Sequence, residues 1–516
     1  MSWLKRNKNT LLVMLILLVL SIPVIIPLLH SGFFESDDGE WMIIRLSAFH
    51  ESLRDGQFPV RFLGRLNQGY GYPVANFLYP GFMYFSEVFH ALGLGFVNSI
   101  KAVLVVSMIG SALFAFLWLS TIFEKTTAAV GALFYLYLPY HLFDLYKRGS
   151  VGEIFALLFI PLILWMIERK NIFLISGGIF LLMISHNTLA AFFIPLLFIY
   201  AFLRRKISAK NIIFSFIIGI LMSSFFTIPA IFELPYTRFS TTQISNITDY
   251  FAPIPLVGSI SFIVLFSSAI LFMFSKYKLL KGNKFSDLLI LFVVISVFSI
   301  FFSSEASMIL WNFIPSSVVQ FPFRLLSYLI IALSFLSSYI VSFFTNSKKW
   351  IVICILVFVL LLNSSEYLAP SKFFDKGENF YSTNEATTTV QNEYMPIWVK
   401  NMPFEHFKNK VELLNGAGQL NNIIYNSNKI TFSSAGHDQL KVRINTIYYP
   451  GWQAYIDSRA ININYKNDNG VMDIIIPPGN HNVKLFFGET SLRLFSDVLS
   501  ILSFLILLFL TKKIYP

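Results

Sequence analysis

Long runs of uncharged, apolar residues recur along most of this chain, and they constrain its fold more than any other feature. A helix satisfies its own backbone hydrogen bonds in lipid, so a run of about 18 or more such residues predicts a membrane-spanning helix. Hydrophobic residues make up 55% of the 516 residues and charged residues only 13%, whereas soluble domains carry about 25% charged residues. The sequence therefore predicts a polytopic α-helical membrane protein.

The positions of the basic residues orient these spans. Lysine and arginine gather in short connections between apolar runs, which is typical of cytoplasmic loops. Twelve spans place both termini in the cytoplasm, in agreement with the basic residues Lys5 and Lys512 near the two ends. The predicted spans are residues 10–30, 99–123, 127–143, 151–168, 171–186, 188–203, 211–232, 254–275, 286–304, 324–344, 349–368 and 493–511.

The formal net charge of +11 does not indicate a nucleic-acid partner, because the basic residues are dispersed among loops between apolar spans. The apolar stretch from Phe77 to Leu94 would change the side of every later loop if it crossed the membrane. We therefore predict that it lies at the outer interface. The first span is too long for the core of a cleaved signal peptide, so we expect it to be retained.

The composition changes near the end of the chain, where Asn, Asp and Thr become frequent and apolar runs become short. Val442, Ile444 and Thr446 alternate with other residues, as do Ile474 and Ile476, and this pattern predicts antiparallel strands. We expect a small extracytoplasmic β-sandwich. The predicted regions are a transmembrane module at 1–368 with a first outer loop at 31–98, a mainly β domain at 369–491, and a last span with a cytoplasmic tail at 492–516.

Two adjacent carboxylates, Asp37 and Asp38, follow the first span. Met42, Leu46 and Phe49 come next at helical spacing, which predicts an amphipathic helix on the membrane surface. One aspartate is enough to cap that helix. Two carboxylates at a lipid surface also suit a divalent metal such as Mg²⁺ or Mn²⁺, or the removal of a proton from a hydroxyl group. Both interpretations stay open.

Further polar residues are predicted on the same outer side. Lys147 and Arg148 run against the orientation rule, and with Arg324 they suit the neutralisation of a lipid-linked phosphate. An exposed ion pair between Arg148 and Glu153, or snorkelling at the lipid boundary, is the structural alternative. The other candidates are Arg61, which could contact a phosphate, Tyr70 and Tyr72, whose rings could stack on a sugar, and His186. Each of them also fits a polar turn or an aromatic belt.

These residues carry two resemblances. The aspartate pair, in an outer loop with an amphipathic helix, resembles the acidic motif of the GT-C superfamily of polytopic glycosyltransferases. More of the chain resembles the bacterial YfhO-type membrane proteins and relatives labelled pyruvoyl-tetrahydropterin synthase-related, although no residue supports a pterin activity. The similar segments are Gly69–Pro73, Arg148–Gly149 with Glu153, Ser185–Asn187, Gln320–Arg324, Asn392–Pro396, Tyr449–Asp457 and Pro478–His481, and Ser458 stands where a glycine is usual.

The resemblance implies inverting transfer of a sugar from a polyprenyl-phosphate donor to a glycan, teichoic acid or lipid acceptor of the cell envelope, at the outer face of the plasma membrane. Asp37 or Asp38 would accept the proton, with or without a divalent metal. Lys147, Arg148 and Arg324 would neutralise the departing phosphate, and the groups that would orient them are Glu153 and His186.

Two alternatives come from other classes. A transporter or assembly scaffold for lipid or polysaccharide needs no catalysis, but transporters bind substrate near the bilayer midplane. In this sequence the mid-span positions are almost all apolar, and polar residues gather toward one face. A relative without catalysis that uses only its β domain is the other alternative, and the aspartate pair argues against it.

Overall fold

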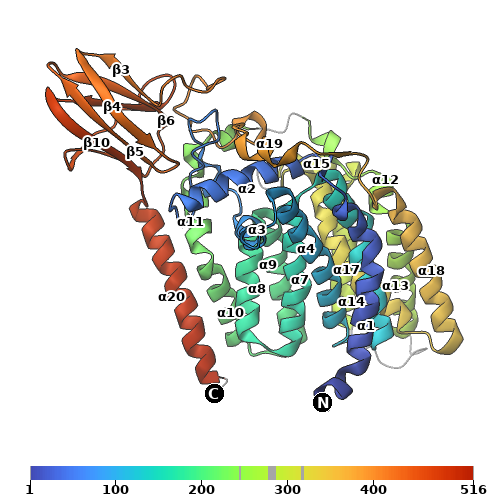
Figure 1. The fold of residues 1–516 in the computed structure, drawn as a ribbon. Coiled ribbons are helices and arrows are strands. Elements are labelled where there is room, and N and C mark those ends of the chain that lie inside the picture. Colours follow the sequence, from blue (N-terminus) through green and yellow to red (C-terminus); the bar gives the residue numbers. More distant parts are fainter. Residues whose placement is uncertain (1, 243–245, 277–285, 315–318, 515–516) are drawn as a thin grey trace.

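The computed structural model describes residues 2–242, 246–276, 286–314 and 319–514. Its helices form a bundle that carries a β domain at one end, and both chain ends lie at the other end (Figure 1). We call these the β-domain end and the terminal end.

Eight helices of the described residues are long and apolar enough to cross a membrane. Three bent helix pairs raise this number to eleven when each pair counts as one span. The eight are α1 (Ser2–Ile25) with η1 (Ile26–Leu29), α4 (Phe96–Leu119), α7 (Val151–Arg169), α9 (Asn187–Arg204), α14 (Ser286–Ser303), α17 (Leu326–Val341) with η8 (Pro322–Leu325), α18 (Asn346–Ser364) with η9 (Ser365–Tyr367), and α20 (Ser491–Ile514).

The bent pairs are α5 (Lys125–Tyr137) with α6 (Pro139–Phe143) and η3 (Asp144–Arg148), α10 (Ala209–Met222) with α11 (Ser224–Phe232), and α12 (Ile254–Val257) with α13 (Ser259–Lys276). The remaining predicted span is the shorter apolar helix α8 (Ile172–Ser185). Every predicted span is thus helical, and the helix lengths and composition are those of a polytopic membrane protein.

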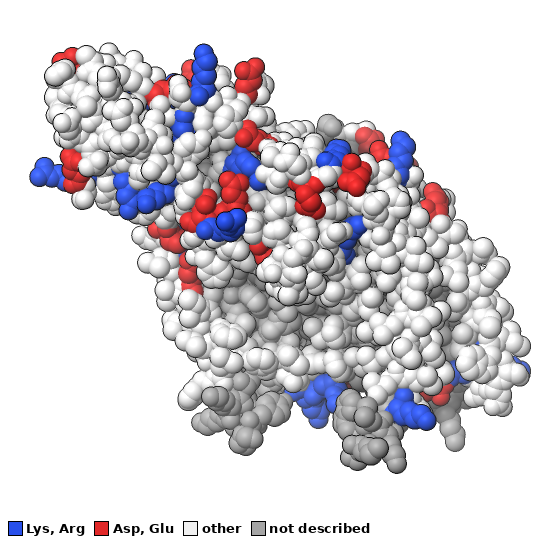
Figure 2. All heavy atoms as spheres, in the orientation of Figure 1, with Lys and Arg blue, Asp and Glu red and all other residues white. Residues whose placement is uncertain are grey.

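Charged side chains gather toward the two ends of the molecule in the view of Figure 2, with a broad, almost uncharged band between them. Lysine and arginine outnumber acidic residues along the lower edge of this view, which is the terminal end. A surface that faces lipid has to be free of charge, because a charged group costs several kcal/mol in the hydrocarbon layer. The band therefore has the character of a lipid-facing surface.

Small residues bring the central helices together. α7 and α17 are buried along nearly their whole length, whereas α1, α18 and α20 expose most of their apolar surface. Ser334 and Ser338 of α17 donate hydrogen bonds to the carbonyl groups of Gly131 and Thr127 on α5. A Cβ atom on Gly131 would collide with Ser338 Oγ, so the close approach depends on glycine.

The helix α2 (Gly39–Arg54) lies across the β-domain end of the bundle (Figure 1). Its predicted apolar face is buried, but Arg45 and Ser47 are buried as well. Other protein segments therefore cover part of the polar face of this helix, whereas Arg54 is exposed. Ser47 Oγ, for example, lies 2.7 Å from the carbonyl oxygen of Tyr381. The next helix, α3 (Gly81–Ala91), has 11 residues and is too short to span, as predicted for 77–94.

The β domain consists of two antiparallel sheets, with strand orders β4-β5-β10-β7-β8 and β3-β6-β9. Alternate side chains such as Val442, Ile444 and Ile474 are buried between them, as in a sandwich. The predicted strands are confirmed in β6 and β9. The strands are β3 (Val411–Asn415), β4 (Gly418–Tyr425), β5 (Lys429–Gly436), β6 (Leu440–Ile447), β7 (Trp452–Ile456), β8 (Arg459–Ile461), β9 (Val471–Ile476) and β10 (Gly479–Phe487).

The segment before the first sandwich strand lies on the helical bundle rather than in the sandwich. β2 (Phe373–Phe374) pairs with β1 (Phe33–Phe34) directly after the first span. It is followed by α19 (Gly377–Thr383) and by residues 384–396, which we call the strap. The predicted β region at 369–491 thus begins with a long connection that covers the end of the bundle, and the sandwich itself begins at Val411.

Candidate functional site

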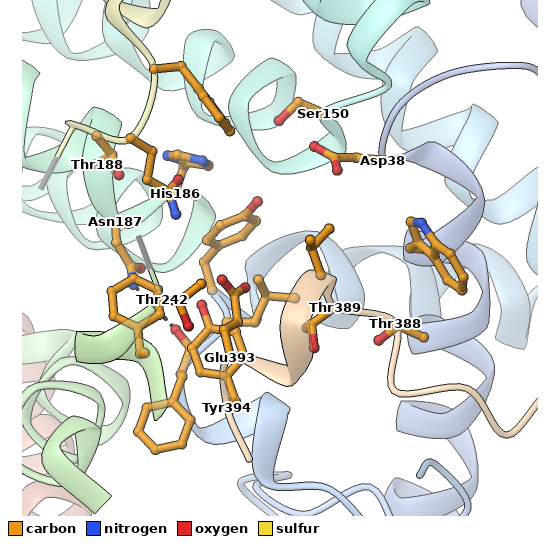
Figure 3. A pocket seen from close by; sticks show the side chains of 18 of the residues that line it. Asp38, Ser150, His186, Asn187, Thr188, Thr242, Thr388, Thr389, Glu393 and Tyr394 are labelled. Atoms are coloured by element: carbon orange, nitrogen blue, oxygen red, sulfur yellow. Dashed lines mark hydrogen bonds between the residues drawn. The ribbon is translucent and has the colours of Figure 1, made fainter. Parts of the chain in front are cut away.

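A cavity of about 560 Å³ lies at the β-domain end of the bundle, between α2, α9, α11 and the strap (Figure 3). The side chains of Asp38, His186 and Glu393 point toward the same space from three separate segments. Five of the residues predicted from the sequence line this cavity, and two charged residues that were not predicted join them. These seven are Asp37, Asp38, Arg148, His186 and Arg324, with Arg45 and Glu393.

Glu153 is the centre of a buried ion-pair cluster behind the cavity wall. Its Oε1 accepts hydrogen bonds from Arg148 at 2.5 Å and from Arg324 at 2.9 Å, and His186 Nε2 lies 3.7 Å away. Arg148 also donates to Asp144 at 2.8 Å. The Glu153 side chain is only 1% exposed, so the structural alternative of an exposed Arg148–Glu153 pair is wrong. Burial strengthens the attraction between these charges and holds both guanidinium groups in one orientation.

The loop before α2 is held against the end of η3 by backbone hydrogen bonds. The amide groups of Asp37 and Asp38 donate to the carbonyl oxygens of Lys147 and Arg148 at 3.0 and 2.8 Å. This brings the Asp38 carboxylate within 3.6 Å of the Arg148 guanidinium group. The contact joins two predicted site residues that are far apart in the sequence.

Capping does not explain the aspartates. The Asp38 side chain makes no cap hydrogen bond, and it is Ser36 Oγ that accepts from the Gly39 amide at 3.2 Å. Burial of Asp37 raises the pKa of its carboxyl group, and neighbouring Asp38 adds to this effect while Lys147 opposes it. Both carboxylates line the cavity, and Asp38 has no role in capping the helix.

Gly149 makes this contact between the two loops possible, and Gly149→Ala is expected to disrupt it. The residue has φ +64°, and a Cβ there would lie 2.9 Å from the Gly39 amide nitrogen and collide with Ser36 Oγ. Gly93→Ala is the matched control, because Gly93 also has a positive φ, +97°, but nothing within 4 Å of an added Cβ. We expect Gly149→Ala to lower the Tm of the detergent-solubilised protein more than Gly93→Ala, whose cost is backbone strain alone. Equal Tm values would contradict this account.

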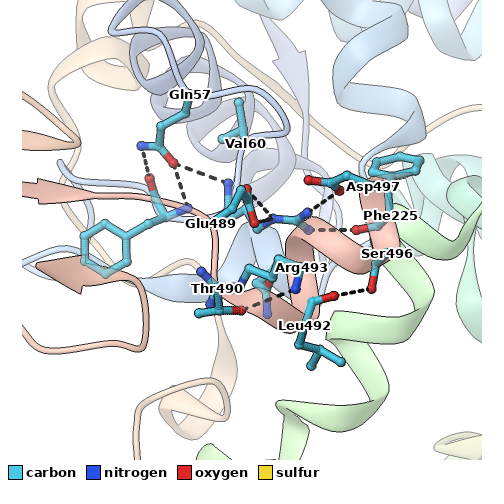
Figure 4. A network of polar contacts seen from close by, with 12 residues as sticks. Gln57, Val60, Phe225, Glu489, Thr490, Leu492, Arg493, Ser496 and Asp497 are labelled. Carbon is cyan, nitrogen blue, oxygen red and sulfur yellow. Dashed lines mark hydrogen bonds and ion pairs between the residues drawn. The ribbon is translucent and has the colours of Figure 1, made fainter. Parts of the chain in front are cut away.

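Besides Glu153, four predicted residues do not line the cavity. Arg61 is engaged elsewhere, by Glu489 and Asp497 at the start of α20 (Figure 4), so its predicted contact with a phosphate is not supported. The other three are Lys147, which is exposed beside the cavity, Tyr70, whose ring packs against Phe407 in the connection before β3, and Tyr72, whose hydroxyl group accepts from the Tyr394 amide of the strap.

Two cavity residues, Arg45 and Glu393, were missed from the sequence as site residues. Arg45 lies in the middle of α2, where it resembled any polar residue of an amphipathic helix. Glu393 belongs to one of the similar segments, Asn392–Pro396, but nothing in the sequence indicated its role. Burial raises the pKa of Glu393 to about 7, with Asp38 adding to the shift and Arg45 opposing it.

The residues of the cavity fit a divalent metal only in part. Across the described residues, no group of three or more His, Cys, Asp or Glu side chains is placed to hold a metal ion. Asp37 and Asp38 supply two carboxylates. Mg²⁺ is commonly held by one or two carboxylates together with phosphate oxygens of the substrate and water, so these aspartates fit a metal that a phosphate substrate helps to bind.

The cavity borders an apolar strip on the side of the bundle. Asn187 and Ala191, in the first turns of α9, line the cavity. Along the same helix Ala191, Pro195, Ile199 and Phe202 are all exposed, and their spacing of three or four residues places them on one face. A polar cavity at the end of the bundle is thus continuous with an apolar helix face of the kind that contacts lipid.

A scan against protein-family models and a search of the curated proteins found no match to this chain. The geometry of the cavity, its charges and its apolar border therefore have to carry the functional argument. They place carboxylates and guanidinium groups in one cavity, beside an apolar helix face.

Proposed function

We propose that this protein is an inverting glycosyltransferase that moves a sugar from a polyprenyl-phosphate donor to a hydroxyl group of a cell-envelope acceptor. One observation carries the proposal: carboxylates and guanidinium groups meet in a single cavity that borders an apolar helix face. The acceptor would be a glycan, a teichoic acid or a lipid. The resemblance to GT-C enzymes supports the same reaction.

In this reaction the acceptor oxygen attacks the anomeric carbon of the sugar. A carboxylate of the cavity takes the proton of the hydroxyl group, the bond between the anomeric carbon and the phosphate oxygen breaks, and polyprenyl phosphate leaves. Arg148 and Arg324 would offset the charge that grows on the phosphate. Their ion pairs with Glu153 hold them in place before the reaction, and such preorganised groups stabilise a transition state without reorganisation.

The lipid part of the donor would lie on the apolar strip of α9, with its phosphate in the cavity. The positive-inside rule supports a cytoplasmic terminal end, since Lys and Arg outnumber acidic residues along that edge in Figure 2. Both termini would then be cytoplasmic, and the cavity and the β domain extracytoplasmic, in a cell membrane. A β domain beside the cavity would bind or steer the acceptor polymer.

A divalent metal at Asp37 and Asp38 remains part of the proposal, as a group that would neutralise phosphate charge together with these carboxylates. Transport of lipid or polysaccharide is the weaker candidate. A transporter needs a polar binding site near the midplane, whereas the buried ion pairs around Glu153 lie in the first turn of α7, at the β-domain end.

Transfer of radiolabelled sugar tests the proposal directly. Purified protein in phospholipid vesicles is given a panel of polyprenyl-phosphate sugars with envelope acceptors, with and without EDTA. We expect transfer by the wild type, and a rate about 10- to 100-fold lower for Asp37→Asn and Asp38→Asn, because Asp38 contacts Arg148 and Asp37 lines the same cavity. Asp249→Asn is the control, since Asp249 is an exposed carboxylate of the described chain outside the cavity lining.

Donor binding gives a second, independent readout. Native mass spectrometry of the wild type with polyprenyl phosphate alone should show a bound lipid. A variant with both Arg148→Ala and Arg324→Ala should not bind it. No bound polyprenyl phosphate and no transfer from any donor would overturn the proposal. Transfer at full rate by both aspartate variants would leave the reaction in place and remove these aspartates from it.

A further inference from the structure

The strap contains an unusual concentration of left-handed backbone. Thr388, Gln391 and Asn392 have φ values of +63°, +56° and +52°. Residues with a Cβ disfavour this region, and a β-branched residue such as Thr388 disfavours it most. Backbone of this kind persists where surrounding contacts enforce it, and it clusters at functional sites. All three residues lie within five positions of Glu393.

Arg45 holds the start of this strained stretch. Its Nε donates to Thr388 Oγ1 at 3.0 Å, and its Nη2 donates to the Thr388 carbonyl oxygen. The Arg45 guanidinium group is buried, lines the cavity and makes no ion pair with a carboxylate of the described residues. α2 thus uses a buried cation to fix a main-chain segment that is 343 positions away.

Tyr394 holds the other side of Glu393. Its backbone amide donates to the Tyr72 hydroxyl oxygen at 3.0 Å. Its ring is stacked on Phe77 at 5.3 Å and on Phe239 at 5.6 Å, with interplanar angles of 4° and 15°. Thr388 before Glu393 and Tyr394 directly after it are thus held by other segments, and the Glu393 side chain points into the cavity (Figure 3).

The cavity carboxylates differ in whether they have a cationic partner. Asp38 lies 3.6 Å from the Arg148 guanidinium group, so it already has a cationic partner. Within the described ranges, the Glu393 carboxylate accepts no hydrogen bond and forms no ion pair. An unpaired carboxylate in a partly buried site binds a proton more readily than a paired one.

We infer that Glu393 is the catalytic residue that accepts the proton of the acceptor hydroxyl group, and that Arg45 is the positioning residue that holds its strap. The inference rests on the proposed glycosyl transfer and names the group that performs one of its steps. As the acceptor oxygen bonds to the anomeric carbon, its proton passes to Glu393, and the donor phosphate leaves with the electrons of the broken bond. Glu393 then returns the proton to water, while Asp37 and Asp38 serve the phosphate side.

Glu393→Gln removes the basic oxygen and keeps the shape of the side chain. We expect kcat to fall about 10²- to 10⁴-fold, the usual contribution of a positioned general base, with little change in KM. Glu385→Gln is the matched control, because Glu385 is another carboxylate of the strap, pairs with His406 and lies outside the cavity lining. Glu393→Asp keeps the charge and is expected to retain measurable transfer. Such transfer would show that the protein still folds when residue 393 is changed.

The pH dependence of kcat distinguishes a catalytic role of Glu393 from a structural one. The wild-type rate should fall as the pH drops below about 7, where Glu393 becomes protonated, and Glu393→Gln should lack this decrease. Arg45→Met removes the charge that opposes the raised pKa, so the decrease should begin at a higher pH. The other charged or titratable groups that line the same cavity are Asp37, Asp38, Tyr79, Arg148, His186, Tyr250, Arg324 and Tyr394.

Each outcome decides between the two proposals. A wild type that transfers sugar and a Glu393→Gln variant that keeps its kcat and its acidic decrease would overturn this inference alone. An unchanged pH profile in Arg45→Met would remove Arg45 from its positioning role. A wild type that neither binds polyprenyl phosphate nor transfers sugar would overturn the proposed function, and this inference with it.

Discussion

Glu153→Gln is expected to lower the free energy of unfolding by about 3–5 kcal/mol, the usual cost of breaking a buried ion pair from one side. The Glu153 carboxylate accepts from both Arg148 and Arg324, and all three side chains are at most 4% exposed. A neutral amide leaves two buried guanidinium groups with less compensation. Its amide hydrogens also face donors rather than acceptors if the group rotates. We expect the same change to abolish transfer, because the two arginines lose their common anchor.

Thermal unfolding of the detergent-solubilised protein, followed by the loss of the monodisperse peak in gel filtration, measures the effect. Glu305→Gln removes the same charge from an exposed side chain and should leave the Tm almost unchanged, as most surface substitutions do. A double variant with Arg324→Gln should cost less than the sum of the single changes, since the two groups share one interaction. A Glu153→Gln variant as stable as Glu305→Gln would contradict the assignment of Glu153 as the centre of the cluster.

Arg493→Met is expected to destabilise the protein by a similar amount, about 3–5 kcal/mol, and to loosen the β domain from the bundle. Arg493 is fully buried at the start of α20, and donates to both oxygens of Glu233 at 2.9 and 2.7 Å. Glu233, which follows α11, also accepts from Asn76 and from the Tyr449 hydroxyl group, each at 2.9 Å. One carboxylate therefore joins the segment 31–98, α11, the β domain and the last helix.

The hydrogen-exchange rate of backbone amides around Tyr449 measures the loosening. In Arg493→Met this rate should increase more than the rate in the centre of the bundle. The double variant Arg493→Met with Glu233→Leu should recover part of the stability, since apolar replacements of a whole buried pair are often neutral. Arg459→Met is the control, because Arg459 is exposed on β8. Equal exchange in Arg493→Met and Arg459→Met would show that the pair does not hold the domain in place.

The sequence alone predicted the helical spans and the β region, because both depend on local properties. An apolar run determines a span wherever it occurs, as at residues 151–168 and in α7 (Val151–Arg169). Alternation at Val442 and Ile444 determines a strand in the same way. Charge placement also predicted that Asp38, Arg148 and Arg324 lie toward one side, and all three line one cavity.

The internal arrangement of the site required the tertiary structure. Nothing local distinguishes Arg61, which is occupied by Glu489 and Asp497 more than 400 positions away, from Arg45, which faces the cavity. The capping role predicted for an aspartate belongs to Ser36, while the backbone of Asp37 and Asp38 is bonded to the end of η3.

The sequence by itself thus determined which segments form long apolar helices, which form strands, and that several polar residues of the cavity lie toward one end of these helices. Only the tertiary structure decided which charges meet, for instance Arg324 with Glu153 across 171 positions, and Arg45 with the strap across 343. The physical reason is range. Burial in lipid and strand alternation act on neighbouring residues, whereas an ion pair depends on a few ångströms between helices whose packing is determined by the whole chain.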